Sequence, residues 1–556
     1  MKNYLLLFSF SFLILGCKKT KDPAPGPTTA VITSLNCTGA TFSSPGTAGA
    51  SYSGTITVPY SSGNGVSYAA GSAIPSSGVS GLTAVLQSGT LANGSGSFTY
   101  NVTGTPAATG VARFNIAFSG MSCSADLVIN EAPLVQYGTP FAGVPNRQDA
   151  TIYQVNMRAF SATSNFAGVT ARLDSIKALG VNVVYLMPVF PVGTTNAVNS
   201  PYCVKDYKGI NTEFGTLTDL RTLVDGAHSR NMSVILDWVA NHTSWDNSWI
   251  TTHPDWYLKN GSGAIISPPG MGWNDVAQLN FANADMRLEM IKSLKYWVYT
   301  ANVDGFRFDY ADGPPADFWK QTIDSLHNIS THNLLIMAEG NRSSHFTSGF
   351  DFIFGFSFYG QLKSIFNNSQ PTTAFDAINN SEYVNASNGQ QVVRYITNHD
   401  VNGSDGTPLT LFGGATGSMS AFVIAAYMKS VPMIYNGQEV GTPFQLVFPF
   451  TGADINWTLN PGTTAEYKRV IAFRNSSLAI RRGTLTAYSS ADVCAFTKIS
   501  GAEKVFVAAN VRNATMTYTL PGTVANLTWT DAMTGSNMAL GTQITLAPYT
   551  YLVLKN

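Results

Sequence analysis

Short apolar runs alternate with amphipathic segments through most of the chain after residue 150. The segments between the runs carry apolar residues at helical spacing, for example Val169, Leu173, Ile176 and Leu179. The runs have the length of buried strands and lie at 151–156, 181–187, 233–237, 305–309, 334–339, 392–397 and 433–435, with a weaker one at 350–352. Strands that alternate with helices predict an α/β fold, and eight of them predict a closed (β/α)8 barrel, or TIM barrel.

We expect this barrel to cover residues 150–479, interrupted by an insert at 242–283. The insert is rich in Trp, Pro and Gly, shows little periodicity and follows the third predicted strand, where barrel enzymes often carry binding loops. Its aromatic residues either stack on a ligand or form the core of the insert, and the sequence leaves both roles open for Trp245, Trp256, Tyr257 and Trp273.

Two further regions show the period of two that is typical of antiparallel strands. Residues 30–130 are dominated by Gly, Ser, Thr and Ala, with short alternating runs between turn residues. They predict an immunoglobulin-like β-sandwich, followed by a linker at 131–149. A second β-sandwich is expected at 480–556. The first sandwich has no catalytic constellation, so it serves as a spacer or binds carbohydrate.

The balance of charge limits the classes of ligand. The 556 residues include 32 basic and 32 acidic side chains, and only 12% of the chain is charged. This balance gives no electrostatic attraction for nucleic acid, so no nucleic-acid partner is expected. Solubility must depend on Ser, Thr, Asn and Gly, as suits an exported protein, and a neutral sugar fits better as ligand.

The first residues predict export. An apolar run at 4–15 ends directly before Gly16 and Cys17, and it is too short for a membrane-spanning helix of about 20 residues. The sequence around Cys17 resembles the signal of bacterial lipoproteins. This resemblance implies a signal peptide at 1–17, lipidation of Cys17 and a tether at 18–29. The expected location is the cell envelope, anchored by lipid to the outer membrane on its periplasmic or surface side.

Four other cysteines remain. Cys37 and Cys123 lie near the two ends of the predicted N-terminal sandwich, so an oxidising compartment could join them, and the sequence leaves a disulfide or two free thiols open. Cys203 and Cys494 have no spacing that suggests metal binding or catalysis, and we interpret them as packing residues.

Four acidic residues each close an apolar run, namely Asp237, Asp309, Glu339 and Asp400. The carboxyl ends of all strands in a parallel barrel meet at one rim, so these side chains should converge there. Acidic residues also cap helices, but that alternative accounts for one of the four more easily than for all of them together.

The sequences around these acids resemble, in order, the four motifs of the α-amylase family of glycoside hydrolases: 237–242 (DWVANH), 305–309 (GFRFD), 338–340 (AEG) and 398–400 (NHD). The likeness runs from about residue 151 to the C-terminus. It implies a retaining mechanism, which needs one ionised carboxylate at the anomeric carbon and one protonated carboxyl at the leaving oxygen.

The resemblance assigns the roles of these acids. Asp309 would be the nucleophile, Glu339 the general acid/base, and Asp400 a third catalytic residue that binds hydroxyls and stabilises positive charge, while Asp237 would be structural. Arg307 stands two residues before the nucleophile on the same face of the strand, so it can hold Asp309 ionised.

Four further residues would bind substrate. His242 and His399 are similar to the family's hydroxyl-binding histidines, and Tyr153 and Tyr202 resemble aromatic residues that flank the cleaved sugar.

The chain also departs from the family's pattern. Asp312 and Gly313 stand where many members have Lys-His, which leaves the leaving-group contacts open, and Ser200 stands where a His is frequent. Gln278 replaces an Asp that commonly reaches a structural calcium ion. Because Ca²⁺ depends on carboxylates for much of its affinity, we expect no required cofactor, with Asn241 as the remaining candidate ligand for calcium.

These observations predict an α-amylase-like enzyme that cleaves starch or maltooligosaccharides internally. Expected partners are the α-glucan, the membrane through the lipid anchor, and other envelope proteins of glucan uptake. Cyclomaltodextrinase, α-glucosidase or transglycosylase activity on the same scaffold stays open. So does a non-catalytic glucan-binding protein, although no catalytic carboxylate is lost.

Overall fold

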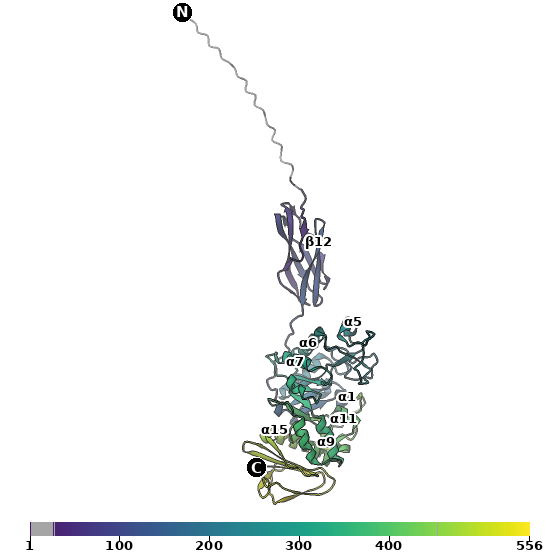
Figure 1. The fold of residues 1–556 in the computed structure, drawn as a ribbon, viewed down its shortest axis with the longest axis vertical. Coiled ribbons are helices and arrows are strands. Elements are labelled where there is room, and N and C mark those ends of the chain that lie inside the picture. The colour runs from purple at the N-terminus through teal and green to yellow at the C-terminus, as the bar shows by residue number, and fades with distance from the viewer. Residues whose placement is uncertain (2–25, 27, 453) are drawn as a thin grey trace. The chain divides into compact units, whose positions relative to one another are not determined.

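The computed structural model describes residues 1, 26, 28–452 and 454–556 (Figure 1). The predicted signal peptide with Cys17, and nearly all of the predicted tether, lie outside the described residues. Within the described part of the chain, no helix is both long and apolar enough to cross a membrane. The chain divides into two compact units, Met1–Leu134 and Val135–Asn556.

The first unit is a β-sandwich. One sheet has the order β1-β4-β10-β8-β6 with β2 on β4, and the other has the order β3-β12-β11-β7. Alternate residues of the long strands, such as Ile56, Val58, Phe98 and Phe114, are buried between the two sheets. The strands are β1 (Ser34–Leu35), β2 (Thr41–Phe42), β3 (Gly46–Thr47), β4 (Tyr52–Asn64), β6 (Ile74–Pro75), β7 (Ser77–Gly78), β8 (Leu82–Leu86), β10 (Asn93–Gly104), β11 (Gly110–Phe118) and β12 (Met121–Asn130).

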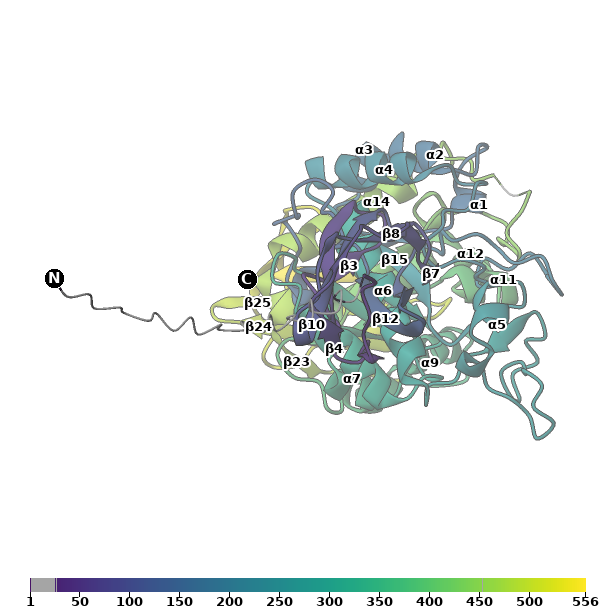
Figure 2. The same cartoon turned by 90° about the horizontal axis from the view of Figure 1, so that it is seen from above.

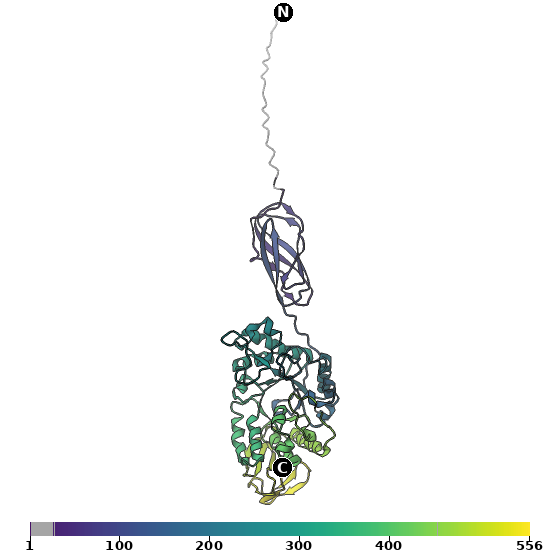
Figure 3. The same ribbon diagram turned by 90° about the vertical axis from the view of Figure 1, so that its right-hand side faces the viewer.

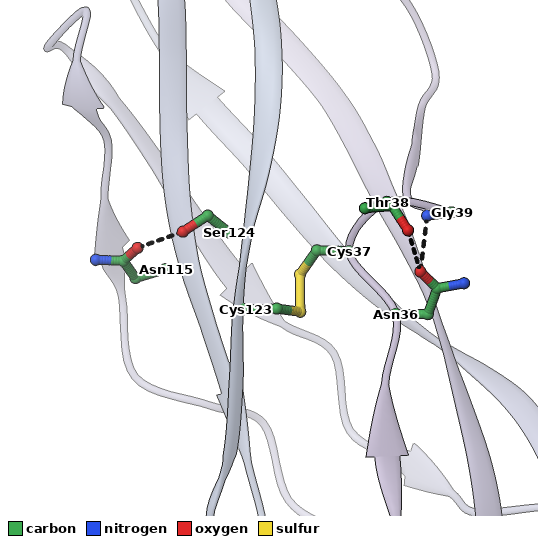
Figure 4. The surroundings of a disulfide bond; sticks show 7 residues. All are labelled: Asn36, Cys37, Thr38, Gly39, Asn115, Cys123 and Ser124. Carbon is green, nitrogen blue, oxygen red and sulfur yellow. Dashed lines mark hydrogen bonds between the residues drawn. A yellow bond between two sulfur atoms is a disulfide. The ribbon is translucent and has the colours of Figure 1, made fainter.

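A disulfide joins Cys37 to Cys123, as Figure 4 shows. The sequence left this pair open, and the structure forms it across a separation of 86 residues. Closing a loop of that length lowers the entropy of the unfolded chain by the equivalent of about 4.6 kcal/mol. The small sandwich therefore has a covalent constraint in addition to its core.

The second unit contains a closed barrel of eight parallel strands, which confirms the predicted fold class. In barrel order they are β13 (Ile152–Val155), β14 (Val183–Leu186), β15 (Ser233–Val239), β18 (Gly305–Asp309), β19 (Leu335–Ala338), β20 (Phe352–Phe354), β21 (Gln391–Arg394) and β22 (Val431–Tyr435). Strand β15 extends two residues beyond the predicted end, so that Asp237 lies inside the strand. The weak run at 350–352 is a strand that begins only at Phe352.

Helices surround the barrel strands, and in Figure 2 α4, α7 and α9 lie around them. Helix α4 shows why such segments are helical: Thr216 and Asp219 form a capping box, and the apolar stripe of Leu220, Leu223 and Val224 is buried. The helices around the barrel are α1 (Met157–Phe160), α2 (Phe166–Thr170), α3 (Leu173–Ala178), α4 (Leu217–Ser229), α6 (Ala284–Ala301), α7 (Ala316–His327), α8 (Ser344–Ser348), α9 (Phe356–Phe366), α10 (Phe375–Ser381), α11 (His399–Ser404), α12 (Pro408–Leu411), α13 (Gly414–Tyr427), α14 (Pro461–Ser476) and α15 (Leu478–Arg482).

The insert between β15 and α6 is a small lobe built on a two-stranded antiparallel sheet, β16 (His242–Ser244) with β17 (Val276–Gln278), and the short helix α5 (Trp249–Thr252). Trp256 is buried there between Trp249 and His253, and Tyr257 is buried as well. These two aromatic residues form the core of the insert, whereas Trp245 and Trp273 stay partly exposed.

The C-terminal part is a six-stranded sheet, β23-β24-β25-β30-β27-β28, with a separate pair β26-β29. Strand β25 is buried on both faces: Val505 and Val507 belong to the barrel's core, and Phe506 and Ala508 to the core of the C-terminal part. Figure 3 shows these strands in yellow. They are β23 (Thr484–Ala487), β24 (Val493–Ser500), β25 (Glu503–Asn510), β26 (Met516–Thr519), β27 (Thr528–Asp531), β28 (Asn537–Ala539), β29 (Gln543–Leu546) and β30 (Tyr551–Lys555).

The segment predicted as a linker, 131–149, differs from expectation. From Val135 it belongs to the same compact unit as the barrel. The Tyr137 N–H donates to the carbonyl of Tyr299 at 2.7 Å, and Asp149 pairs with Arg481 and Arg482. The segment is rich in Pro and Gly and so resembles a linker in sequence. These polar contacts hold it against the barrel, together with the ring of Phe141 stacked on His228 and Val144 packed against the barrel core.

Candidate active site

The strand ends bring the predicted acids to one place. Asp309 is the last residue of β18 and Glu339 directly follows β19, its neighbour in the barrel. In the adjacent strand β15, Asp237 is paired in register with Arg307. Asp400 lies in the first turn of α11, whose N-terminus is capped by the Asn398 side chain.

Arg307 is the centre of this cluster and is fully buried. Its Nη1 lies 2.6 Å from Asp237 Oδ1 and 3.1 Å from Asp309 Oδ1. Its Nη2 lies 2.8 Å from Glu339 Oε1. One guanidinium thus holds three carboxylates side by side, and the contact between Arg307 and Asp309 that the sequence predicts is formed.

The electrostatic effect on Asp309 is the reverse of the one expected. Burial and the neighbouring carboxylate of Glu339 raise the pKa of Asp309 well above its usual range, and these effects outweigh the opposing influence of Arg307. Burial also raises the pKa of Asp237. The cluster holds more carboxyl groups than one buried cation can balance, which favours a proton on one of its buried carboxyl groups.

The two predicted histidines are buried and neutral. Burial lowers the pKa of His399 to about 4, and it lowers the pKa of His242 to about 4 as well. His399 Nε2 lies 2.6 Å from the Tyr202 hydroxyl and 3.3 Å from Asp400 Oδ1, so these three residues belong to the cluster. His242 lies at the start of the insert, with its ring 5.5 Å from that of Trp273.

Tyr153 lies outside this cluster, in contrast to the sequence expectation. Successive side chains of a strand point to opposite faces, and in β13 the inward position belongs to Gln154, whose Nε2 lies 2.8 Å from His399 Nδ1. Tyr153 is fully buried on the other face, where its hydroxyl donates to Glu439 at 2.6 Å.

Sequence reasoning missed three residues that contact the predicted ones. Gln154 fixes His399 as described, and the Tyr185 hydroxyl donates to Asp237 Oδ2 at 2.5 Å. The backbone N–H of Tyr310 donates to Glu339 Oε2 at 2.8 Å, with φ of 41° at Tyr310. A polar residue inside an otherwise apolar strand was the available signal for Gln154, whereas a backbone donor such as Tyr310 leaves no signal in the sequence.

The residues of the expected calcium position bind one another. Asn241 Nδ2 donates to Gln278 Oε1 at 3.0 Å, and Gln278 Nε2 donates to the Asn241 carbonyl at 2.9 Å. A Cβ on Gly313 would lie only 2.5 Å from Asn241 Oδ1. Among the residues that the structure describes, no group of three or more His, Cys, Asp or Glu side chains could hold a metal ion. This self-paired donor set is neutral and offers a calcium ion no carboxylate.

Comparison with known proteins agrees with this geometry. A model of the α-amylase catalytic domain family matches residues 148–261. α-Amylase 3 of Dictyoglomus thermophilum is 26% identical over 357 residues, which cover 56% of this chain and 68% of that protein. An oligo-1,6-glucosidase of Parageobacillus thermoglucosidasius is 29% identical over 197 residues, covering 29% of this chain and 34% of that one. The chain thus spans between about a third and two thirds of these relatives.

Solved structures share the fold. An α-amylase from Lactobacillus plantarum superposes with a TM-score of 0.64 at 24% identity, covering 74% of this chain and 99% of that one. A cyclic α-maltosyl-(1→6)-maltose hydrolase from Arthrobacter globiformis gives a TM-score of 0.62 at 21% identity, with the same coverage.

The barrel and the acids clustered at the carboxyl ends of its strands define a glycoside hydrolase. The family match and these relatives support an α-amylase family glycosidase.

Proposed function

We propose that this enzyme acts on α-glucans and hydrolyses α-glucosidic bonds in starch or maltooligosaccharides with retention of configuration. The observation that carries the proposal is the position of Asp309 and Glu339 on the two nitrogens of the Arg307 guanidinium. Two carboxyl groups held this close suit a double displacement, because the carboxylate itself attacks the sugar in the first step. A single displacement would instead need room for a water molecule between the carboxylate and the sugar.

In the first displacement, the carboxylate of Asp309 attacks the anomeric carbon while Glu339 gives its proton to the leaving oxygen. In the second, Glu339 takes a proton from water, and the resulting hydroxide equivalent releases the sugar from Asp309. The raised pKa of Asp309 favours a proton held in the cluster before substrate binds. The chemistry requires that this proton be on Glu339 when the glycosidic oxygen is in place.

Other residues of the cluster would hold the sugar. The side chain of Asp400 is 56% exposed, so it is free to accept hydrogen bonds from hydroxyl groups. His399 is neutral and is held by Gln154 and Tyr202, which fixes its ring orientation. His242 is neutral and lies next to Trp273, a partly exposed ring suited to stacking on a sugar face.

The test combines Asp309→Asn with stereochemistry. The variant should lose hydrolysis of maltooligosaccharides by about 10⁴-fold or more while keeping its melting temperature, because an amide cannot form the glycosyl-enzyme. Asp324→Asn is the matched control, since Asp324 pairs with Lys320 on the exposed side of α7. In wild-type reactions, proton NMR in the first minutes should show the α anomer. Initial release of the β anomer, or near-normal turnover by a folded Asp309→Asn enzyme, would contradict the proposal.

Linkage and location are parts of the same proposal. The resemblance favours internal cleavage, as in an α-amylase, and leaves the choice between α-1,4, α-1,6 and cyclic substrates to chromatography of products from starch, pullulan and cyclodextrin. We also propose that lipidated Cys17 holds the enzyme at the cell envelope. The even balance of charge on the chain suits a neutral glucan as substrate better than an ionic partner.

A further inference from the structure

The loop that follows β22 carries an exposed apolar surface at the carboxyl-end rim of the barrel. Among the residues that the structure describes, the exposed phenylalanines are Phe444 and Phe448, which are 41% and 46% exposed. Val447, on the same loop, is 57% exposed. We call these three residues the rim strip. Single exposed apolar residues are ordinary, but three of them within five positions indicate a surface that binds a ligand.

The rim strip lies next to the proposed active site. The Leu446 N–H donates to Asn402 Oδ1 at 2.7 Å. Gln445 Nε2 donates to the carbonyl of Gly403 at 2.9 Å. Both acceptors belong to α11, the helix whose first turn carries Asp400. The loop therefore packs against the helix that presents one of the proposed catalytic acids.

The ring of Phe450 connects the rim strip to the site. Phe450 is buried, and its ring centroid lies 6.2 Å from that of His399 and 5.8 Å from that of Phe448. One aromatic ring thus separates exposed Phe448 from His399, which itself contacts Tyr202 and Asp400. A glucan chain held at His399 would reach the rim strip with its next sugar units.

Polar contacts fix the loop in place. Arg158 is buried, and its Nη1 donates to the carbonyl of Pro449 at 3.1 Å and to that of Asn199 at 2.7 Å. Its Nε and Nη2 each bind a carboxylate oxygen of Glu213 at 3.0 Å. Phe450 has φ of 72°, a left-handed conformation that bulky residues rarely adopt and that occurs at ligand-binding segments. A ring that is already fixed loses little freedom when a ligand binds.

The loop also lacks charge. No Asp, Glu, Lys or Arg stands between Glu439 and Asp454, so the loop offers no ionic contact to a charged ligand. A glucose unit has an apolar C–H face and an edge of hydroxyl groups. Aromatic rings can cover such a face while the hydroxyl groups stay in water. An apolar strip beside polar acids therefore fits a neutral sugar chain.

Building on the proposed function, we propose that the rim strip binds a glucose unit of the α-glucan beyond those held at the catalytic acids. Phe448 stacks on that unit, and Phe444 and Val447 extend the apolar surface. Phe450 supports the ring of Phe448 from the side of the active site, and Arg158 is a positioning residue that holds the loop. The rim strip makes the enzyme prefer long maltooligosaccharides to short ones.

The experiment measures chain-length preference in the full-length enzyme. The measured quantity is the ratio of kcat/KM for maltoheptaose to kcat/KM for maltotriose, because the shorter chain leaves fewer units to reach the rim strip. Phe448→Ala removes an exposed side chain, so it should fold normally. It should lower the ratio by about five- to tenfold, the effect of one aromatic contact, with kcat/KM for maltotriose nearly unchanged.

Two further variants complete the design. Phe448→Trp keeps an aromatic face and should preserve or raise the ratio, which a purely structural role of phenylalanine would not predict. Leu288→Ala is the matched control, because Leu288 is a 49% exposed apolar residue on α6. That helix leads into β18, which lies opposite β22 in the barrel, so the ratio should stay at the wild-type value.

The outcomes separate this inference from the function on which it rests. A wild-type ratio near one, or an unchanged ratio in Phe448→Ala, would overturn the inference alone. A wild-type enzyme that cleaves neither oligosaccharide would overturn the proposed function. Calorimetric titration of Asp309→Asn with maltoheptaose, with and without Phe448→Ala, then decides the inference separately. Weaker binding by the double variant supports the inference, whereas equal affinities, or no binding by either protein, overturn it.

Discussion

Replacing Arg307 with Met tests how far the buried guanidinium stabilises the three carboxylates around it. Methionine fills a similar volume without charge, and Arg307 is fully buried with contacts of 2.6, 3.1 and 2.8 Å to three carboxylates. Breaking a buried ion pair by removing one partner typically costs about 3 to 5 kcal/mol. Asp237 keeps its hydrogen bonds from Tyr185 and Tyr202, at 2.5 and 3.1 Å, so we expect the lower part of that range at pH 7.

The loss should depend on pH in a defined direction. Burial raises the pKa of Asp237 and of Asp309 even in the wild-type protein, and loss of the cation raises both further. A carboxyl whose folded-state pKa lies above its unfolded value stabilises the fold while it is protonated, and this contribution is lost as pH rises through the folded-state pKa. The difference in stability between wild type and Arg307→Met should therefore be smaller at pH 5 than at pH 7.

Scanning calorimetry at both pH values measures this difference, and at pH 7 the variant should melt several degrees below wild type. Arg113→Met is the control, because Arg113 pairs with Asp126 on the exposed surface of the first unit, where such a pair contributes about 0 to 1 kcal/mol. Arg307→Lys keeps the charge and should be intermediate. The reasoning is refuted if Arg307→Met melts with wild type at pH 7, or if the difference grows toward pH 5.

Two further predictions concern the metal and the anchor. Dialysis against a chelator should change neither the melting temperature nor the activity, because Asn241 and Gln278 satisfy each other's amides and offer no carboxylate; a fall of several degrees that added calcium restores would show the opposite. Cys17→Ser should move activity from the membrane fraction to the soluble fraction, because it removes the predicted site of acylation. Activity that stays with the membrane after complete signal processing would indicate another anchor.

The barrel was predictable because each strand is a short apolar run between helical segments, and both kinds of pattern are local. Which side chains of a strand face the barrel's interior was not predictable in the same way. All residues of β13 are buried, so the run has no polar alternation to show which side chains face the barrel's interior, and Tyr153 was assigned to the site in place of Gln154.

Contacts between distant segments were also beyond the sequence. Arg307 was placed beside Asp309 because it stands two positions before it on the same strand face, but its contacts with Asp237 and Glu339 depend on neighbouring strands. The balance of pKa effects at Asp309 depends on the same assembly. The polar anchoring of Tyr137 and Asp149 is likewise formed with segments far along the chain.

The burial of β25 on both faces limits where the gene of this enzyme can be cut and joined to another. Val505 and Val507 complete the barrel's core, Arg512 donates to the carbonyl of Ile365, and Ser420 donates to that of Tyr549. A gene fusion that ended near residue 480 would leave apolar barrel surface open to water, and its product should aggregate. We expect exchange of modules between related genes to be tolerated instead at the boundary near residue 134, where the disulfide-closed sandwich can be replaced or lost as one unit.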